Sequence, residues 1–133
     1  MTSPPPSAPV PLVLLVDDNA KNLRLAGDVL RAAGFQTIEA TTGRAGIALA
    51  IESTPDVILL DLELPDMQGA DVALELRKES QTARIPVVAL SARRYVGDRE
   101  RLAAAGFAGY LEKPIDVGEF PEQVRSYCGP ASP

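Results

Sequence analysis

The chain contains no histidine and only one cysteine, and both absences limit its chemistry. Without histidine it has no Ser–His–Asp or Cys–His catalytic arrangement, no imidazole metal ligand and no role as a phosphohistidine carrier. Cys128 has no second cysteine with which to form an internal disulfide, so we expect the reducing conditions of the cytoplasm. Any chemistry must therefore depend on carboxylates, hydroxyls, amines or a bound cation.

Excess positive charge and long apolar runs are also absent. Thirteen basic residues against eighteen acidic ones give a net charge of −5, which argues against direct binding of nucleic acid. The longest apolar runs, Leu12–Val16 and Val57–Leu60, are too short to span a bilayer, so we expect no membrane insertion. A length of 133 residues predicts a single domain with its own hydrophobic core.

Short apolar segments alternate with segments in which apolar residues have helical spacing. The most apolar segment, Val57–Asp61, is typical of a strand buried on both faces of a parallel sheet. This alternation predicts right-handed crossovers and an α/β fold, a three-layer α/β/α sandwich. The expected strands are 12–16, 37–40, 57–61, 87–90 and 109–112. The expected helices are 20–33, 42–53, 69–78 and 96–105, followed by a last helix through Phe120, Val124 and Tyr127. Thr42 is the expected N-cap of the second helix.

The helical segments differ in how they should pack. Segment 96–105 is rich in charge and poor in large apolar residues, so we expect it to pack shallowly on the sheet. In the last helix Asp116 and Glu119 are spaced as a capping box, but Pro121 conflicts with a start at Asp116 and favours a start nearer Glu119. The predicted buried sides are Ala45, Ala48, Leu49 and Ile51 in 42–53, and Ala70, Ala73, Leu74 and Leu76 in 69–78.

Both ends of the chain are rich in proline and small residues. Residues 1–11 contain five prolines and are expected to be a disordered tail, although such a segment can also bind an aromatic-lined groove. Residues 129–133 are expected to be a second, shorter tail. The folded domain is therefore predicted to comprise residues 12–128.

Polar side chains follow four of the five predicted strands. Asp17 and Asp18 follow the first, Asp61 ends the third, Ser91 follows the fourth and Lys113 the fifth. Parallel strands bring their carboxyl ends to one rim, where ligands bind. Three carboxylates there repel unless a cation joins them, and oxygen ligands favour Mg²⁺ before Ca²⁺. With an ammonium and a hydroxyl beside the metal, this set indicates phosphoryl transfer, with Asp61 as the nucleophile.

Together these motifs closely resemble the receiver domain of bacterial two-component response regulators. The resemblance rests on Asp17-Asp18, on Asp61 within the run 60–69, on Ser91-Ala92 and on Lys113-Pro114, and it extends over residues 12–127. It implies a flavodoxin-like, five-stranded parallel sheet of order 2-1-3-4-5. It also implies transfer of a phosphoryl group to Asp61 from a sensor histidine kinase, a histidine phosphotransfer protein or a small phosphodonor.

The same resemblance assigns roles to individual residues. Mg²⁺ would be held by Asp17, Asp18, Asp61 and the backbone carbonyl of Glu63. The peptide bond between Lys113 and Pro114 would be cis.

Further roles that the resemblance implies concern switching and the lifetime of the phosphorylated state. Ser91 would move toward the phosphoryl group and Tyr110 would turn inward, reshaping the face of the fourth helix, fifth strand and fifth helix for an unknown downstream protein. Tyr110 is equally well explained as core packing. Glu63 and Arg93 would stand over the site and modulate loss of the phosphoryl group, so replacing both with alanine should shorten the phosphorylated lifetime.

We therefore expect a stand-alone, chemotaxis-regulator-like receiver that signals by binding protein, either directly or within a phosphorelay. It would be no enzyme beyond catalysing its own phosphorylation and dephosphorylation. The main alternative is a phosphorylation-independent scaffold with a receiver fold. A haloacid-dehalogenase-type phosphatase fits less well, because its nucleophile lies on the first strand motif and it carries a cap or additional domain. A flavodoxin-like electron carrier is disfavoured since Asp17 and Asp18 would repel the FMN phosphate.

Overall fold

The computed structural model describes residues 10–92 and 99–128, and within these ranges the predicted strands and helices are all present. The strands are β1 (Leu12–Val16), β2 (Gln36–Ala40), β3 (Val57–Asp61), β4 (Val87–Ala92) and β5 (Gly109–Lys113). The helices are α1 (Ala20–Ala32), α2 (Gly43–Ser53), α3 (Gly69–Lys78), α4 (Arg99–Ala104) and α5 (Phe120–Tyr127). No helix among the described residues has the length and apolar character needed to cross a membrane.

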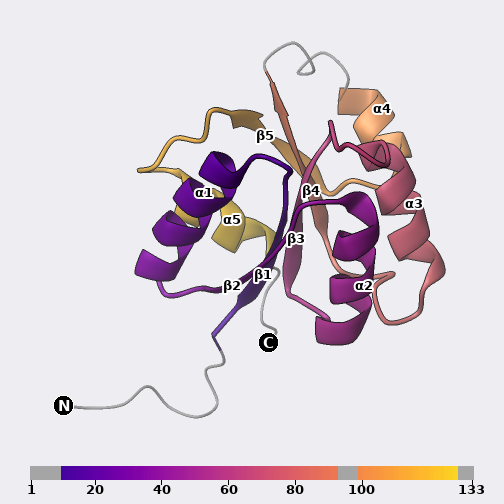
Figure 1. The fold of residues 1–133 in the computed structure, drawn as a ribbon, viewed down its shortest axis with the longest axis horizontal. Coiled ribbons are helices and arrows are strands. Elements are labelled where there is room, and N and C mark those ends of the chain that lie inside the picture. Colours follow the sequence, from indigo (N-terminus) through magenta and orange to yellow (C-terminus); the bar gives the residue numbers. More distant parts are fainter. Residues whose placement is uncertain (1–9, 93–98, 129–133) are drawn as a thin grey trace.

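The strands form one parallel sheet of order β2-β1-β3-β4-β5, which confirms the predicted α/β sandwich. Helices α1 and α5 cover one face, and α2, α3 and α4 cover the other (Figure 1). The register pairs Asp61 of β3 with Leu90 of β4, and Ala92 of β4 with Lys113 of β5. The carboxyl ends of these strands are therefore level with one another.

The central strands separate two apolar cores. In β3, Val57 and Leu59 face the core under α1 and α5, and Ile58 and Leu60 face the core under α2 and α3. All five residues of β3 are buried, as predicted for a central parallel strand. Each buried aliphatic side chain contributes on the order of 1.5–3 kcal/mol to folding. The strand that ends on Asp61 is therefore one of the most firmly held parts of the molecule.

The predicted buried side of α2 was largely wrong. Gly43, Gly46 and Ala50 are its buried residues, while Ala45 and Ala48 are exposed, Ile51 is partly buried and Leu49 is partly buried against the core. The reason is the short distance between α2 and β1, because a Cβ on Gly46 would lie 2.9 Å from Cγ2 of Val16. Only a residue without a large side chain fits at Gly46, so an apolar pattern misses part of the buried side of α2.

In α3 the predicted buried side was partly wrong. Val72 is buried with Ala73 and Leu76 as part of a continuous stripe, whereas Leu74 is 47% exposed and Ala70 is half-buried. The observed stripe has the spacing expected of one helix face. Leu74 lies outside that stripe, so its apolar side chain remains on the surface.

The ends of α4 and α5 refine two predictions. Helix α5 begins at Phe120 with Pro121 in its first turn, and the Asp116 carboxylate accepts hydrogen bonds from the N–H groups of Gly118 and Glu119 in the preceding turn. The start nearer Glu119 is thus confirmed. The predicted beginning of α4 at residue 96 lies outside the described residues. Leu102 of α4 is only partly buried against the core, in agreement with shallow packing.

Candidate functional site

The structure brings the predicted site residues together at the carboxyl edge of the sheet. Asp17 and Asp18 follow β1, Asp61 ends β3, Ser91 lies near the end of β4 and Lys113 ends β5. Asp17, Asp61 and Ser91 are 3%, 6% and 2% exposed, whereas Asp18 faces solvent. Polar groups this deeply buried require partners, and the contacts below supply them for the two aspartates.

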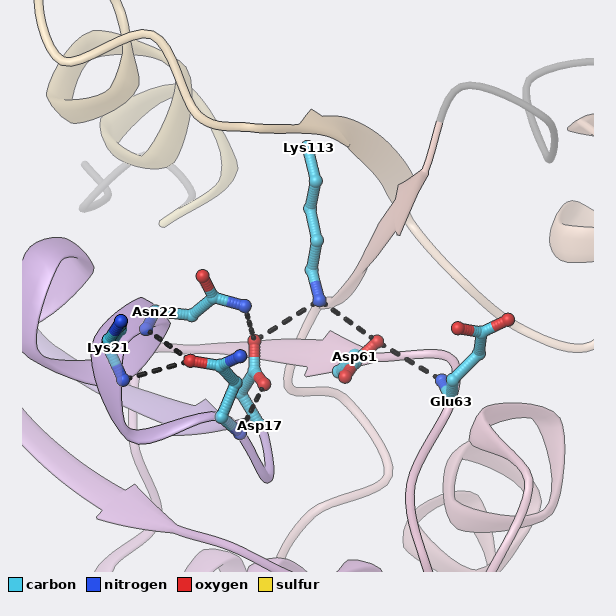
Figure 2. A network of polar contacts seen from close by, with 7 residues as sticks. Asp17, Lys21, Asn22, Asp61, Glu63 and Lys113 are labelled. Atoms are coloured by element: carbon cyan, nitrogen blue, oxygen red, sulfur yellow. Dashed lines mark hydrogen bonds and ion pairs between the residues drawn. The ribbon is translucent and has the colours of Figure 1, made fainter.

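Lys113 joins the first and third strands by two ion pairs. Its Nζ atom lies 3.2 Å from Oδ2 of Asp17 and 3.2 Å from Oδ1 of Asp61, with the side chain reaching between the two carboxylates (Figure 2). Burial alone would lower the pKa of Lys113, but the attraction of Asp17 and Asp61 outweighs burial and raises the pKa above its ordinary value. Lys113 is therefore a fixed positive charge at neutral pH.

Asp61 is held in an environment that disfavours its charged form. Burial raises its pKa above the ordinary 3.8, and the negative charge of Asp17 acts in the same direction. The backbone N–H of Glu63, 3.1 Å from Oδ1, and the charge of Lys113 act in the opposite direction without outweighing burial. The folded protein thus carries a carboxylate that would be stabilised by additional positive charge.

This pKa shift predicts how stability depends on pH. A carboxyl group whose folded pKa is raised favours folding below its unfolded pKa and loses that contribution as pH rises through the folded value. We therefore expect Asp61→Asn to unfold at a higher urea concentration than wild type at about pH 7, with the difference vanishing near pH 3. Urea titrations at both pH values measure this. A variant that is less stable than wild type at neutral pH would contradict it.

Asp17 is oriented by the first turn of α1. Its Oδ1 accepts a hydrogen bond from the backbone N–H of Asn19 at 2.9 Å, and its Oδ2 accepts one from Nδ2 of Asn22 at 3.3 Å. Asn19 itself is the N-cap of α1, since its side chain accepts from the N–H groups of Lys21 and Asn22. Asn19 and Asn22 are supporting residues that the sequence analysis missed. An Asn directly before a helical pattern is the signal that points to Asn19.

The donor set fits a hard divalent cation. Asp17, Asp18 and Asp61 each offer a carboxylate oxygen, and these oxygens lie within 4.8 Å of one another. Among the described residues, these three carboxylates outnumber the ammonium of Lys113, so this set of groups has an excess of acidic groups. Oxygen ligands at such spacing suit Mg²⁺, which keeps several waters and needs few protein ligands. The hydrogen bond from Glu63 to Asp61 also fixes the start of the loop that follows β3.

Ser91 differs from the other buried polar residues. Its Oγ is the one buried side-chain polar atom among the described residues that lacks a hydrogen-bond partner. Burying a hydroxyl without a hydrogen-bond partner reduces the stability of the fold by about 1–3 kcal/mol. A hydrogen-bond acceptor bound at the site would remove this cost. The residue belongs to β4, next to the strand that carries Asp61.

The remaining predicted residues have different outcomes. The Lys113–Pro114 peptide bond is cis, the isomer that the family resemblance implied. Tyr110 is partly buried and packs against the core under α2, α3 and α4, so it has the packing role, while its switching role stays a prediction. Arg93 lies outside the described residues, and its pairing with Glu63 stays a prediction as well.

Comparisons with known proteins agree on one family. Residues 13–125 match the model described as the response regulator receiver domain. The polar-differentiation response regulator DivK of Brucella ovis is 39% identical over 119 residues, which cover 90% of this chain and 97% of DivK.

Solved structures that resemble this chain also belong to response regulators or receiver domains. The chemotaxis response regulator CheY4 of Vibrio cholerae superimposes with a TM-score of 0.84 at 26% identity, covering 90% of this chain and 99% of that chain. The receiver domain of the Pseudomonas aeruginosa sensor histidine kinase PA1611 has a TM-score of 0.82 at 30% identity, with 91% and 99% of the two chains covered. That structure holds a magnesium ion coordinated in the active-site cleft.

Proposed function

Because the chain belongs to the response regulator receiver domain family, we propose that it is a phosphorylation-switched signalling protein that accepts a phosphoryl group on Asp61. The observation that carries the proposal is the convergence of the carboxylates of Asp17, Asp18 and Asp61, two of which, Asp17 and Asp61, pair with the ammonium of Lys113. Its donors would be a sensor histidine kinase, a histidine phosphotransfer protein or a small acyl phosphate. Its output would be binding to another protein.

The proposed reaction is a direct transfer between donor and carboxylate. An oxygen of Asp61 attacks the phosphorus as the bond from phosphorus to the donor imidazole nitrogen breaks. The nitrogen leaves with that electron pair and takes a proton from water. The strand β3 and the N–H of Glu63 hold the attacking carboxylate in place, which provides the positioning on which phosphoryl transfer depends.

Asp17, Asp18 and Asp61, with the backbone carbonyl of Glu63, would hold Mg²⁺. When bound, the ion would neutralise negative charge between the carboxylates and the phosphoryl oxygens. Lys113 would donate to a phosphoryl oxygen from the side of β5, where it already contacts Asp61. The magnesium ion in the PA1611 receiver domain and the oxygen-only donor set both support this assignment.

Ser91 and Tyr110 would convert phosphorylation into a change of surface. The unpaired hydroxyl of Ser91 would donate to a phosphoryl oxygen, and this added contact would favour the conformation in which Ser91 reaches the phosphoryl group. Tyr110, two residues into β5, borders a groove between β5 and α5 that also includes Glu112 and Glu119. A movement of Tyr110 would alter the face of α4, β5 and α5 on which we expect a downstream protein to bind.

Incubation with acetyl phosphate and Mg²⁺, followed by intact mass spectrometry, tests the proposal. We expect a single adduct of about 80 Da, the mass of one phosphoryl group. This adduct should accumulate and be detectable on the intact protein. A protein that takes no adduct under any Mg²⁺ concentration is a phosphorylation-independent scaffold. Rapid release of many equivalents of phosphate without an adduct identifies a phosphatase. Either result contradicts the proposal.

A further inference from the structure

A second carboxylate in the loop after β3 makes contacts that the proposed reaction does not use. Oδ1 of Asp66 accepts a hydrogen bond from the backbone N–H of Gly43 at 2.7 Å, and Oδ2 accepts one from the N–H of Arg44 at 3.1 Å. These are the first two N–H groups of α2, which have no partner within the helix. The two hydrogen bonds lower the pKa of Asp66, so it is ionised at neutral pH.

Asp66 is the point at which this loop is attached to another element. At its base the loop is closed by pairing of Glu63 with Gln68 and by a hydrogen bond from the N–H of Gly69 to the carbonyl of Leu62. Asp66 lies between these residues, opposite the base. Its two hydrogen bonds join the tip of the loop to α2, more than twenty residues away in sequence.

The packing at the same place is close. A Cβ on Gly43 would lie 3.1 Å from both Cβ and Sδ of Met67 and 2.9 Å from Cγ2 of Val72. The first turn of α2 therefore rests directly on the loop beside Asp66. Contact and hydrogen bonds together define the position of the loop relative to α2.

We propose that Asp66 is a positioning residue of the phosphorylation site, which holds the loop after β3 so that Glu63 presents its backbone carbonyl for Mg²⁺. The inference rests on the proposed function. Glu63 is coupled to Asp66 through the chain, because only two residues separate them, and its pairing with Gln68 closes the loop that carries Asp66. With Asp66 truncated, the loop loses both hydrogen bonds to α2, while the contact between Met67 and Gly43 remains.

A simple helix cap is the competing explanation, and Thr42 provides the matched control. Oγ1 of Thr42 accepts a hydrogen bond from the N–H of Ala45 at 3.1 Å, so it caps the same end of α2 without touching the loop. Thr42→Ala and Asp66→Ala should both destabilise α2. Only Asp66→Ala should release the loop.

The test compares wild type, Asp66→Ala, Asp66→Asn and Thr42→Ala by Mg²⁺ titration calorimetry and amide hydrogen exchange. We expect Asp66→Ala to bind Mg²⁺ about 10-fold more weakly, the lower end of the effect typical for groups that orient metal ligands. Asp66→Asn, which keeps one acceptor, should fall between it and wild type, and Thr42→Ala should stay within about 2-fold of wild type. Exchange at Gly69, whose N–H donates to the carbonyl of Leu62 across the base of the loop, should accelerate in Asp66→Ala and not in Thr42→Ala.

Two outcomes would overturn the inference, and they are distinguishable. If wild type binds Mg²⁺ and forms the phosphoryl adduct, but Asp66→Ala binds Mg²⁺ as tightly as Thr42→Ala does, Asp66 is only a helix cap. If wild type takes neither Mg²⁺ nor a phosphoryl group, the proposed function fails and the inference fails with it.

Discussion

Replacing Lys113 with methionine should slow phosphorylation of Asp61 by acetyl phosphate by about 100-fold or more, the effect typical of removing one donor from a charge-stabilising site. The ammonium of Lys113 contacts Asp61 at 3.2 Å and is the only positive group that the described residues place between the carboxylates. Methionine keeps a similar length and volume, so the loss is one of charge and hydrogen bonding.

The same substitution should change the pKa of Asp61. Lys113 lowers that pKa both by its charge and by its hydrogen bond, so Lys113→Met should raise it further. Lys78→Met is the control, because Lys78 is exposed on α3 and pairs only with Glu75 among the described residues. Rates come from the time course of the adduct by mass spectrometry. Phosphorylation of Lys113→Met within about 3-fold of wild type would show that Lys113 has no part in the transfer.

Asp17→Asn should weaken Mg²⁺ binding by about 100-fold, since it removes one buried carboxylate from a small set of oxygen ligands. The amide keeps the shape of the side chain and one acceptor for the N–H of Asn19. Asp28→Asn, on the exposed face of α1, is the matched control. Calorimetric titration with Mg²⁺ measures the effect, and an unchanged dissociation constant would exclude Asp17 as a ligand.

Lys113→Met and Asp17→Asn should shift the pKa of Asp61 in opposite directions. The charge of Asp17 raises the pKa of Asp61, so Asp17→Asn should lower that pKa while Lys113→Met raises it. Carbon NMR of the Asp61 carboxyl group in the metal-free protein reports both values. An unchanged pKa in both variants would mean that burial alone, and not the neighbouring charges, determines the titration of Asp61.

The strands and the residues at their ends could be predicted because the sequence encodes them locally. Val57–Leu60 is a continuous apolar run that ends on a carboxylate, and a parallel sheet places such ends on one rim. Asp17, Ser91 and Lys113 follow from the same rule applied to the other strands. Nothing beyond the order of strands and turns was needed to predict that these side chains would converge.

The supporting contacts could not be predicted because they depend on tertiary distances. Asp66 reads in the sequence as a turn residue, and only the approach of α2 to the loop shows that it caps a helix. The approach itself depends on Gly43 and Gly46, which an apolar pattern ignores because glycine has no side chain. The same cause explains why the buried side of α2 was predicted wrongly.

The site has features that reduce the stability of the fold. Asp61 is buried with a raised pKa, and the hydroxyl of Ser91 is buried without a partner. Such groups oppose folding and are retained where a ligand later satisfies them. The fully buried strand β3 compensates for this cost, and in the proposed function it would also keep Asp61 fixed while Ser91 and Tyr110 respond.

The central claim is that Asp61 itself receives the phosphoryl group. Borohydride reduces an acyl phosphate to an alcohol and leaves free carboxylates intact, so it converts a phosphorylated aspartate to homoserine. Protein treated with acetyl phosphate and Mg²⁺, then reduced and mapped by tandem mass spectrometry, should contain homoserine at position 61 and aspartate at positions 17 and 18. Homoserine at position 17 or 18, or at none of the three in protein that carries the adduct, would contradict the claim.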